Sequence, residues 1–110
     1  MAESVFNLIS YNLHGFNQSC DAFEELIVNL SPSCLLVQEH WLTIDNLSRL
    51  DRYSDFFVIS SPALRKAVDQ GPIFGRPSGG LAMLIHRRFV SYCTVIEISD
   101  RFIAVMIGEL

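Results

Sequence analysis

The chain has 110 residues, of which 50% are hydrophobic and 11% aromatic, and it carries a net charge of −4. This composition excludes a disordered chain and favours one packed domain, predicted over residues 1–110. A domain of this length buries roughly two-thirds of its unfolded surface. The acidic balance excludes an overall basic field for nucleic acid, but a local basic patch or a metal ion can still engage phosphate.

The cysteines and the amino terminus bear on the cellular environment. Cys20, Cys34 and Cys93 have neither the count nor the spacing of a disulfide framework or a zinc site. We expect all three to be reduced and buried, which predicts a reducing compartment, cytoplasmic or nuclear. No segment reaches the roughly 18 apolar residues that cross a bilayer, so we expect no membrane partner. Glu3 and the lack of a basic group argue against a signal peptide.

The first 38 residues predict a strand, a helix and a second strand. Residues 5–11 are apolar on both faces, as in a strand that is covered on both sides. Asp21 is the predicted N-cap of a helix that ends at Ser31-Pro32, and residues 34–38 form a short buried strand. The predicted buried stripe of the helix is Phe23, Leu26, Ile27 and Leu30. This order implies a sheet with a helix packed on it.

A short helix, a third strand and a long loop are expected next. Thr43 is the predicted cap of the short helix, and residues 55–60 read as the strand. Residues 61–78 contain several glycines and prolines, and loops of this length are usually functional or disordered. The basic residues of the loop can contact a nucleic-acid backbone, or they can simply be solvated. They are Arg65, Lys66 and Arg76.

Three extended runs complete the predicted structure. Residues 79–86, 89–98 and 101–108 are apolar, and the second and third runs alternate with a period of two. Only Arg87-Arg88 and Ser99-Asp100 separate the runs, so we expect hairpins and a mixed sheet. The sequence therefore predicts an α/β (α+β) fold, in which one mixed β-sheet has two helices packed on one face.

Polar side chains gather after two of the predicted strands. Asn12 and His14 follow the first strand, and Gln38, Glu39 and His40 follow the second. If these strands are parallel neighbours, both groups share one edge of the sheet, where ligands of such sheets tend to bind. A carboxylate beside an amide is a hard-oxygen site that suits Mg²⁺.

Each of these residues also has a plainer interpretation. Glu39 can be a helix-start or surface carboxylate, and asparagine is common in turns such as the one at Asn12. His14 and His40 lack the spacing of a zinc site and can be surface groups, or can support a ligand by hydrogen bonding.

Three strings resemble the motifs of one enzyme superfamily. SYNLHGFN at 10–17, LLVQEHWL at 35–42 and GGLAMLI at 79–85 are similar in content, order and spacing to motifs of the endonuclease/exonuclease/phosphatase (DNase I-like) superfamily. Tyr11, Trp41 and the run SGGLAMLI look most like the endonuclease domain of non-LTR (LINE-type) retrotransposons, or a host protein derived from one.

The resemblance implies phosphodiester cleavage of DNA with Mg²⁺ (or Mn²⁺). Glu39 matches the metal-binding glutamate of the family, and Asn12 matches the asparagine that lines the same site. Gln38 and His14 would support these two. Some apurinic-site nucleases of the superfamily have an aspartate at the position of His14, so this chain departs from that branch.

The resemblance covers about half of a full domain. The later motifs, N-V-Y-x-P, D-x-N and S-D-H, do not occur in the sequence. The chain then represents the amino-terminal part of a DNase I-like αββα sandwich, which we expect to be inactive alone. We also expect the sheet face that would meet the second layer to be uncovered, which favours self-association.

Three hypotheses follow from the sequence. The chain is part of a magnesium-dependent nuclease, or a non-catalytic remnant that binds a partner through its open sheet, or an unrelated α/β domain with chance motifs. The first two agree on the fold and differ on the chemistry.

Overall fold

The computed structural model describes residues 6–63 and 79–108. In chain order, these ranges form β1 (Leu8–Asn12), α1 (Phe16–Leu30), β2 (Cys34–Gln38), η1 (Leu47–Arg52), β3 (Phe56–Ser61), β4 (Leu81–His86), η2 (Arg87–Tyr92), β5 (Cys93–Ile98) and β6 (Ile103–Ile107), where η marks a 3-10 helix. Most of the predicted loop 61–78 lies outside the described ranges, as do its basic residues Arg65, Lys66 and Arg76.

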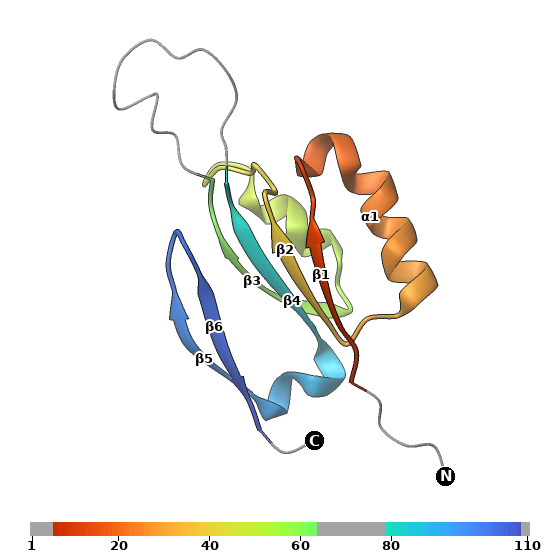
Figure 1. Cartoon of the computed structure of the whole chain (residues 1–110), viewed down its shortest axis with the longest axis vertical. Coiled ribbons are helices and arrows are strands. Elements are labelled where there is room, and N and C mark those ends of the chain that lie inside the picture. The colour runs from red at the N-terminus through yellow and green to blue at the C-terminus, as the bar shows by residue number, and fades with distance from the viewer. Residues whose placement is uncertain (1–5, 64–78, 109–110) are drawn as a thin grey trace.

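Four strands form one mixed sheet in the order β1-β2-β4-β3 (Figure 1). β1 and β2 are parallel, with Leu8 opposite Cys34 and Asn12 opposite Gln38. β4 is antiparallel to both β2 and β3. Two parallel strands need a crossover connection, which α1 provides. The predicted α/β fold with a mixed sheet and helices is confirmed.

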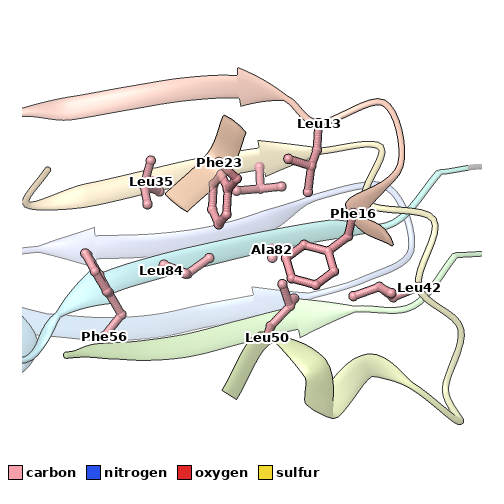
Figure 2. Packing of buried hydrophobic residues seen from close by; sticks show 10 residues of the cluster. Leu13, Phe16, Phe23, Leu35, Leu42, Leu50, Phe56, Ala82 and Leu84 are labelled. Carbon is pink, nitrogen blue, oxygen red and sulfur yellow. The ribbon is translucent and has the colours of Figure 1, made fainter. Parts of the chain in front are cut away.

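One face of this sheet carries the larger core, which we call the helix-side core (Figure 2). Phe23 of α1 is fully buried at its centre, and its ring packs edge-on against the rings of Phe16 and Tyr53 at 6.4 and 5.4 Å. α1 and η1 both contribute to this core, so two helical segments cover the same face. The other buried members are Leu13, Leu35, Val37, Leu42, Leu50, Phe56, Ala82 and Leu84.

The opposite face carries a smaller cluster, the hairpin-side core, on which β5 and β6 pack. Its buried residues from the sheet and η2 are Cys34, Ile59, Met83, Ile85 and Phe89. The hairpin contributes Cys93, Ile103 and Val105, which are only partly buried. Residues of β2 and β4 alternate between the two cores, because successive side chains of a strand point to opposite faces.

β5 and β6 form a two-stranded sheet of their own. The predicted hairpin between the last two runs is confirmed, but the expectation that it continues the first sheet is wrong. η2 contains Arg87-Arg88, where a tight turn was predicted, and residues 89–92, which were predicted to be extended. It separates β4 from β5. The chain consequently leaves the plane of the first sheet. The face that we expected to be uncovered is partly covered by the hairpin, whose own outer side is exposed.

Two local predictions in the first half of the chain need correction. α1 begins at Phe16 with Gly15 as its N-cap, so Asp21 lies inside the helix instead of capping it. Gly15 has a φ of 93°, and a Cβ there would lie 2.5 Å from the ring of Trp41. Tertiary packing against Trp41 thus sets where the helix starts. At the other end, the predicted core residue Leu30 is 52% exposed.

The short helix η1 also begins later than predicted. Its N-cap is Asn46, whose Oδ1 accepts a hydrogen bond from the backbone N–H of Thr43 at 2.8 Å. Thr43 therefore opens the turn that leads into η1, and its side chain does not cap the helix.

The cysteines differ in burial. Cys20, Cys34 and Cys93 are free thiols, but only Cys34 is fully buried, so the prediction of burial is correct for one of the three. Burial raises the pKa of the Cys34 thiol to about 11, which keeps it protonated and unreactive. In the part of the chain that is described, no helix is long and apolar enough to cross a membrane.

Candidate metal centre

The two polar groups lie at one edge of the four-stranded sheet. The carboxyl ends of β1 and β2 lie beside the start of β4 (Figure 1), and Gln38 pairs with Leu81 in the antiparallel register. The backbone N–H of Leu13 donates to the carbonyl of Gln38 at 2.8 Å, which continues the ladder past Asn12. The predicted parallel pairing is therefore confirmed, and it brings Asn12 and Glu39 to neighbouring strand ends.

Backbone hydrogen bonds hold the segment after β2 from both sides. The N–H groups of Gly15 and Phe16 donate to the carbonyls of Glu39 and His40, each at 2.8 Å. On the other side, the N–H of Trp41 donates to the carbonyl of Gly79 at 3.0 Å. The segment that carries Glu39 is thus fixed between the start of α1 and the glycines that precede β4.

Three non-glycine residues at this edge have left-handed backbone conformations. The φ angles are 50° at His14, 58° at Glu39 and 61° at Trp41. Such conformations each cost about 1–3 kcal/mol and gather at ligand sites, where the surrounding structure enforces them. Within the described ranges the one other such residue is Ser31, which ends α1. The strain points to this edge as a functional part of the molecule.

The carboxylate of Glu39 is held in place by two donors. Its Oε2 accepts hydrogen bonds from the indole Nε1 of Trp41 at 2.6 Å and from the backbone N of Gly79 at 2.8 Å. The side chain is partly buried. This geometry disfavours the interpretation of Glu39 as a solvated surface carboxylate. No described residue donates a hydrogen bond to Oε1.

Asn12 and Gln38 have local partners instead of contacting Glu39. The exposed Asn12 accepts a hydrogen bond from the N–H of His14 through Oδ1 at 3.1 Å, which is the turn role considered for it. Gln38 donates to the hydroxyl of Ser10 and to the carbonyl of Leu36. Among the described contacts, Gln38 supports the end of β1 and not the carboxylate of Glu39.

The two histidines differ in their surroundings. His14 is exposed, and its ring lies 4.8 Å from that of Trp41, so it supports Glu39 only through the tryptophan. His40 is fully buried, its Nδ1 accepts from the N–H of Leu42, and its Nε2 lies 2.9 Å from the carbonyl of Ser61. Burial lowers the pKa of His40, so the ring stays neutral and donates from Nε2. His40 therefore joins strand ends and is not a surface group.

The site also includes three residues for which the sequence predicted no role: Trp41, Gly79 and Gly80. Gly80 has a φ of 93°, and a Cβ there would lie 2.3 Å from the ring of His40. The sequence signals were present, since Trp41 follows Glu39 by two residues and the glycine pair precedes an apolar strand. Their meaning depends on a contact between segments about 40 residues apart, which a sequence pattern does not reveal.

The side chains at this edge offer oxygen donors, which suit a hydrated hard cation and not zinc. In residues 6–63 and 79–108 no group of three or more potential ligands from His, Cys, Asp and Glu comes together. A closed zinc site, which needs four such ligands, is therefore not formed there. Mg²⁺ often binds through one or two carboxylates and retains several waters, so Glu39 with the neighbouring Asn12 amide is compatible with it.

No protein-family model and no curated protein sequence matches this chain. Solved structures do. An AP endonuclease from Leishmania major is similar over 87% of this chain, with a TM-score of 0.59 and 14% identity. A 3′-5′ exonuclease from Neisseria meningitidis and a Neisseria 3′ phosphatase bound to a product DNA hairpin each match over 70%, with TM-scores of 0.50 and 16% identity.

The similarity defines a fold and its extent. At such low identity it shows the fold alone: the chain has part of a DNase I-like fold. The chain spans 26–30% of the length of the matching structures. The prediction of a partial DNase I-like fold is therefore confirmed, while the single domain over residues 1–110 stays a prediction.

Proposed function

We propose that this chain forms the amino-terminal part of a magnesium-dependent phosphodiesterase that acts on DNA. The observation that carries the proposal is the fixed carboxylate of Glu39, which sits in a left-handed turn beside the end of β1. The fold similarity to a 3′ phosphatase bound to a DNA hairpin supports DNA as the substrate class. The resemblance to retrotransposon endonucleases remains a prediction within this proposal.

In the proposed site, Glu39 and Asn12 have separate roles. Glu39 binds Mg²⁺ (or Mn²⁺) through Oε1, the oxygen to which no described residue donates. The ion, when bound, supplies positive charge that stabilises a phosphate oxygen and the leaving oxygen. Asn12 uses Oδ1 in its turn, which leaves its Nδ2 donors to bind a phosphate oxygen.

We expect this chain to cleave DNA poorly when expressed by itself. Its sequence has no D-x-N pair to orient a water and no S-D-H histidine to contact the phosphate. Positioning and general-base contributions to catalysis would therefore be missing. Its three free cysteines favour a reducing compartment, the cytoplasm or the nucleus, as its place of action.

Calorimetric titration with Mg²⁺ and Mn²⁺ tests the proposal. The wild-type chain should bind one ion, and Glu39→Gln should abolish this binding because the only proposed anionic ligand is lost. The matched control is Glu97→Gln, which removes an exposed carboxylate on β5 and should bind like wild type. Equal binding by wild type and Glu39→Gln would refute the proposed site. Plasmid nicking with Mg²⁺ that depends on Glu39 would refute the expected inactivity.

A second candidate function rests on the hairpin. The hairpin exposes large apolar side chains, and such patches mark interaction surfaces in soluble proteins. A non-catalytic remnant that binds a partner or a second copy of itself through this surface is the alternative. The exposed residues are Val95, Ile96, Ile98, Phe102 and Met106, which are 41–61% exposed. Absence of metal binding together with self-association in light scattering would favour this alternative.

A further inference from the structure

Both hydrogen bonds to the Glu39 carboxylate end on the same oxygen, although one donor is a side chain and the other is backbone. Oε2 receives both the indole N–H of Trp41 and the backbone N–H of Gly79, at 2.6 and 2.8 Å. Bonds from N–H donors to an ionised carboxylate are roughly twice as strong as bonds between neutral groups. A carboxylate that holds one oxygen between two such donors keeps one orientation.

Trp41 is itself fixed, so its donor is already in place. Its backbone has a φ of 61°, and its N–H donates to the carbonyl of Gly79. Its ring lies so close to Gly15 that a Cβ at that position would overlap it, and the His14 ring packs beside it. Little side-chain freedom remains to be lost when the indole binds Glu39.

We infer that Trp41 is the positioning residue of the metal ligand: its indole N–H holds Oε2 and so presents Oε1 alone for one-oxygen coordination. This inference rests on the proposed function of Glu39. Partners that orient a ligating carboxylate typically change metal affinity by about 10–100-fold when they are removed. Trp41 thus contributes to metal binding without touching the ion.

The chain offers a direct spectroscopic reporter of this contact. Trp41 is its only tryptophan, so the protein has a single indole N–H resonance in a ¹⁵N-labelled sample. In the metal-free protein, Glu39→Gln should shift this resonance strongly, because a neutral acceptor replaces the carboxylate. Mg²⁺ should shift it in the wild type and leave it unchanged in Glu39→Gln.

Metal affinity is the second measurement. Trp41→Phe keeps an aromatic ring above Gly15 but removes the indole N–H, so it should weaken Mn²⁺ binding about tenfold. The matched control is Tyr53→Phe, which removes the hydrogen bond from the Tyr53 hydroxyl to Glu24 Oε1 at 3.2 Å, away from this site. Both variants lose one aromatic donor to a glutamate, and only Trp41→Phe should change the affinity.

The outcomes separate this inference from the function on which it rests. If the wild type binds the ion through Glu39 but Trp41→Phe binds it equally well, the positioning role is overturned and the proposed function stands. An indole resonance that does not respond to Glu39→Gln overturns it as well, even where Trp41→Phe fails to fold. If the wild type binds no metal while the resonance still responds, the proposed function fails and the contact is structural only.

Discussion

The two layers that cover the four-stranded sheet differ in how completely their side chains are buried. On the α1 side, aromatic and aliphatic side chains are fully buried, and Phe23 touches both Phe16 and Tyr53. On the other side, the β5–β6 hairpin contributes only partly buried residues, and its large side chains, such as Ile96 and Met106, are 60% and 61% exposed.

Because of this difference, the helix-side core is the part of the molecule that stabilises the candidate site. The helix-side core lies directly beneath the edge where Leu13 and Phe16 follow Asn12 and His14. The hairpin lies on the opposite face of the sheet and offers an apolar surface instead of a closed core. We therefore expect substitutions in the helix layer to affect the fold and substitutions on the hairpin to affect association.

The largest expected effect is at the centre of the helix-side core. Phe23→Ala should lower the free energy of unfolding by about 3–5 kcal/mol, because it leaves a cavity that its neighbours cannot fill. Phe102→Ala on the hairpin removes a ring that is 48% exposed and should have a much smaller effect. Urea denaturation measures both. Equal losses would show that the two layers are equally well packed.

Glycine substitutions at the strand ends should also differ in their effect on stability between the candidate site and the hairpin. Gly80→Ala should destabilise by about 1–3 kcal/mol, because φ is 93° and the new Cβ would meet the His40 ring. Gly108→Ala, after the last hairpin strand, should be tolerated, since its nearest atom is the Tyr92 carbonyl oxygen at 3.5 Å. Thermal melts measure both variants, and a lower melting temperature for Gly108→Ala than for Gly80→Ala would contradict this prediction.

His40 makes the stability of the fold sensitive to pH. Burial lowers the pKa of His40 below its ordinary value of 6.5. Between the lowered pKa and 6.5, the unfolded state therefore binds more protons than the folded state. The free energy of unfolding should therefore fall as the pH drops below 6.5, and His40→Gln should flatten this dependence. Chemical denaturation between pH 5 and pH 7.5, with NMR titration of the ring, measures it. A ring that protonates above pH 6.5 would contradict this prediction.

The smallest effect on folding is expected on the outer side of the hairpin. Met106→Lys should change the free energy of unfolding by less than about 0.5 kcal/mol and reduce self-association, because it places a charge in the exposed apolar surface. Val28→Lys on α1 replaces a residue that is 77% exposed and should leave association unchanged. Light scattering over a concentration series distinguishes the two variants. A wild-type chain that stays monomeric at all concentrations would contradict association through the hairpin.

The sequence predicts the helix layer better than the hairpin layer for a physical reason. The strand–helix–strand order and the parallel pairing of Asn12 with Gln38 follow from periodicity and from the need for a crossover. A period of two predicts one extended run over residues 89–98. It shows neither that residues 89–92 belong to η2 nor which strand β5 pairs with. The partner is determined by η2, where an arginine pair looks like an ordinary turn.

The candidate site was predictable only in part. The polar residues after each strand point to Asn12 and Glu39, because parallel strands end at one edge of the sheet. The left-handed turn at Glu39 and its bonds to Trp41 and Gly79 arise from contacts between distant segments. The true start of α1 depends on the same packing, since Gly15 lies under the Trp41 ring.

The most direct test of the central claim is paramagnetic broadening of the NMR spectrum by substoichiometric Mn²⁺. We expect the amide signals of Asn12 and Glu39 to broaden first and the signal of Glu97 on the hairpin to be unaffected. Glu39→Gln should remove the effect. Broadening that persists in Glu39→Gln, or that spreads evenly over the exposed carboxylates, would contradict a metal centre at the ends of β1 and β2.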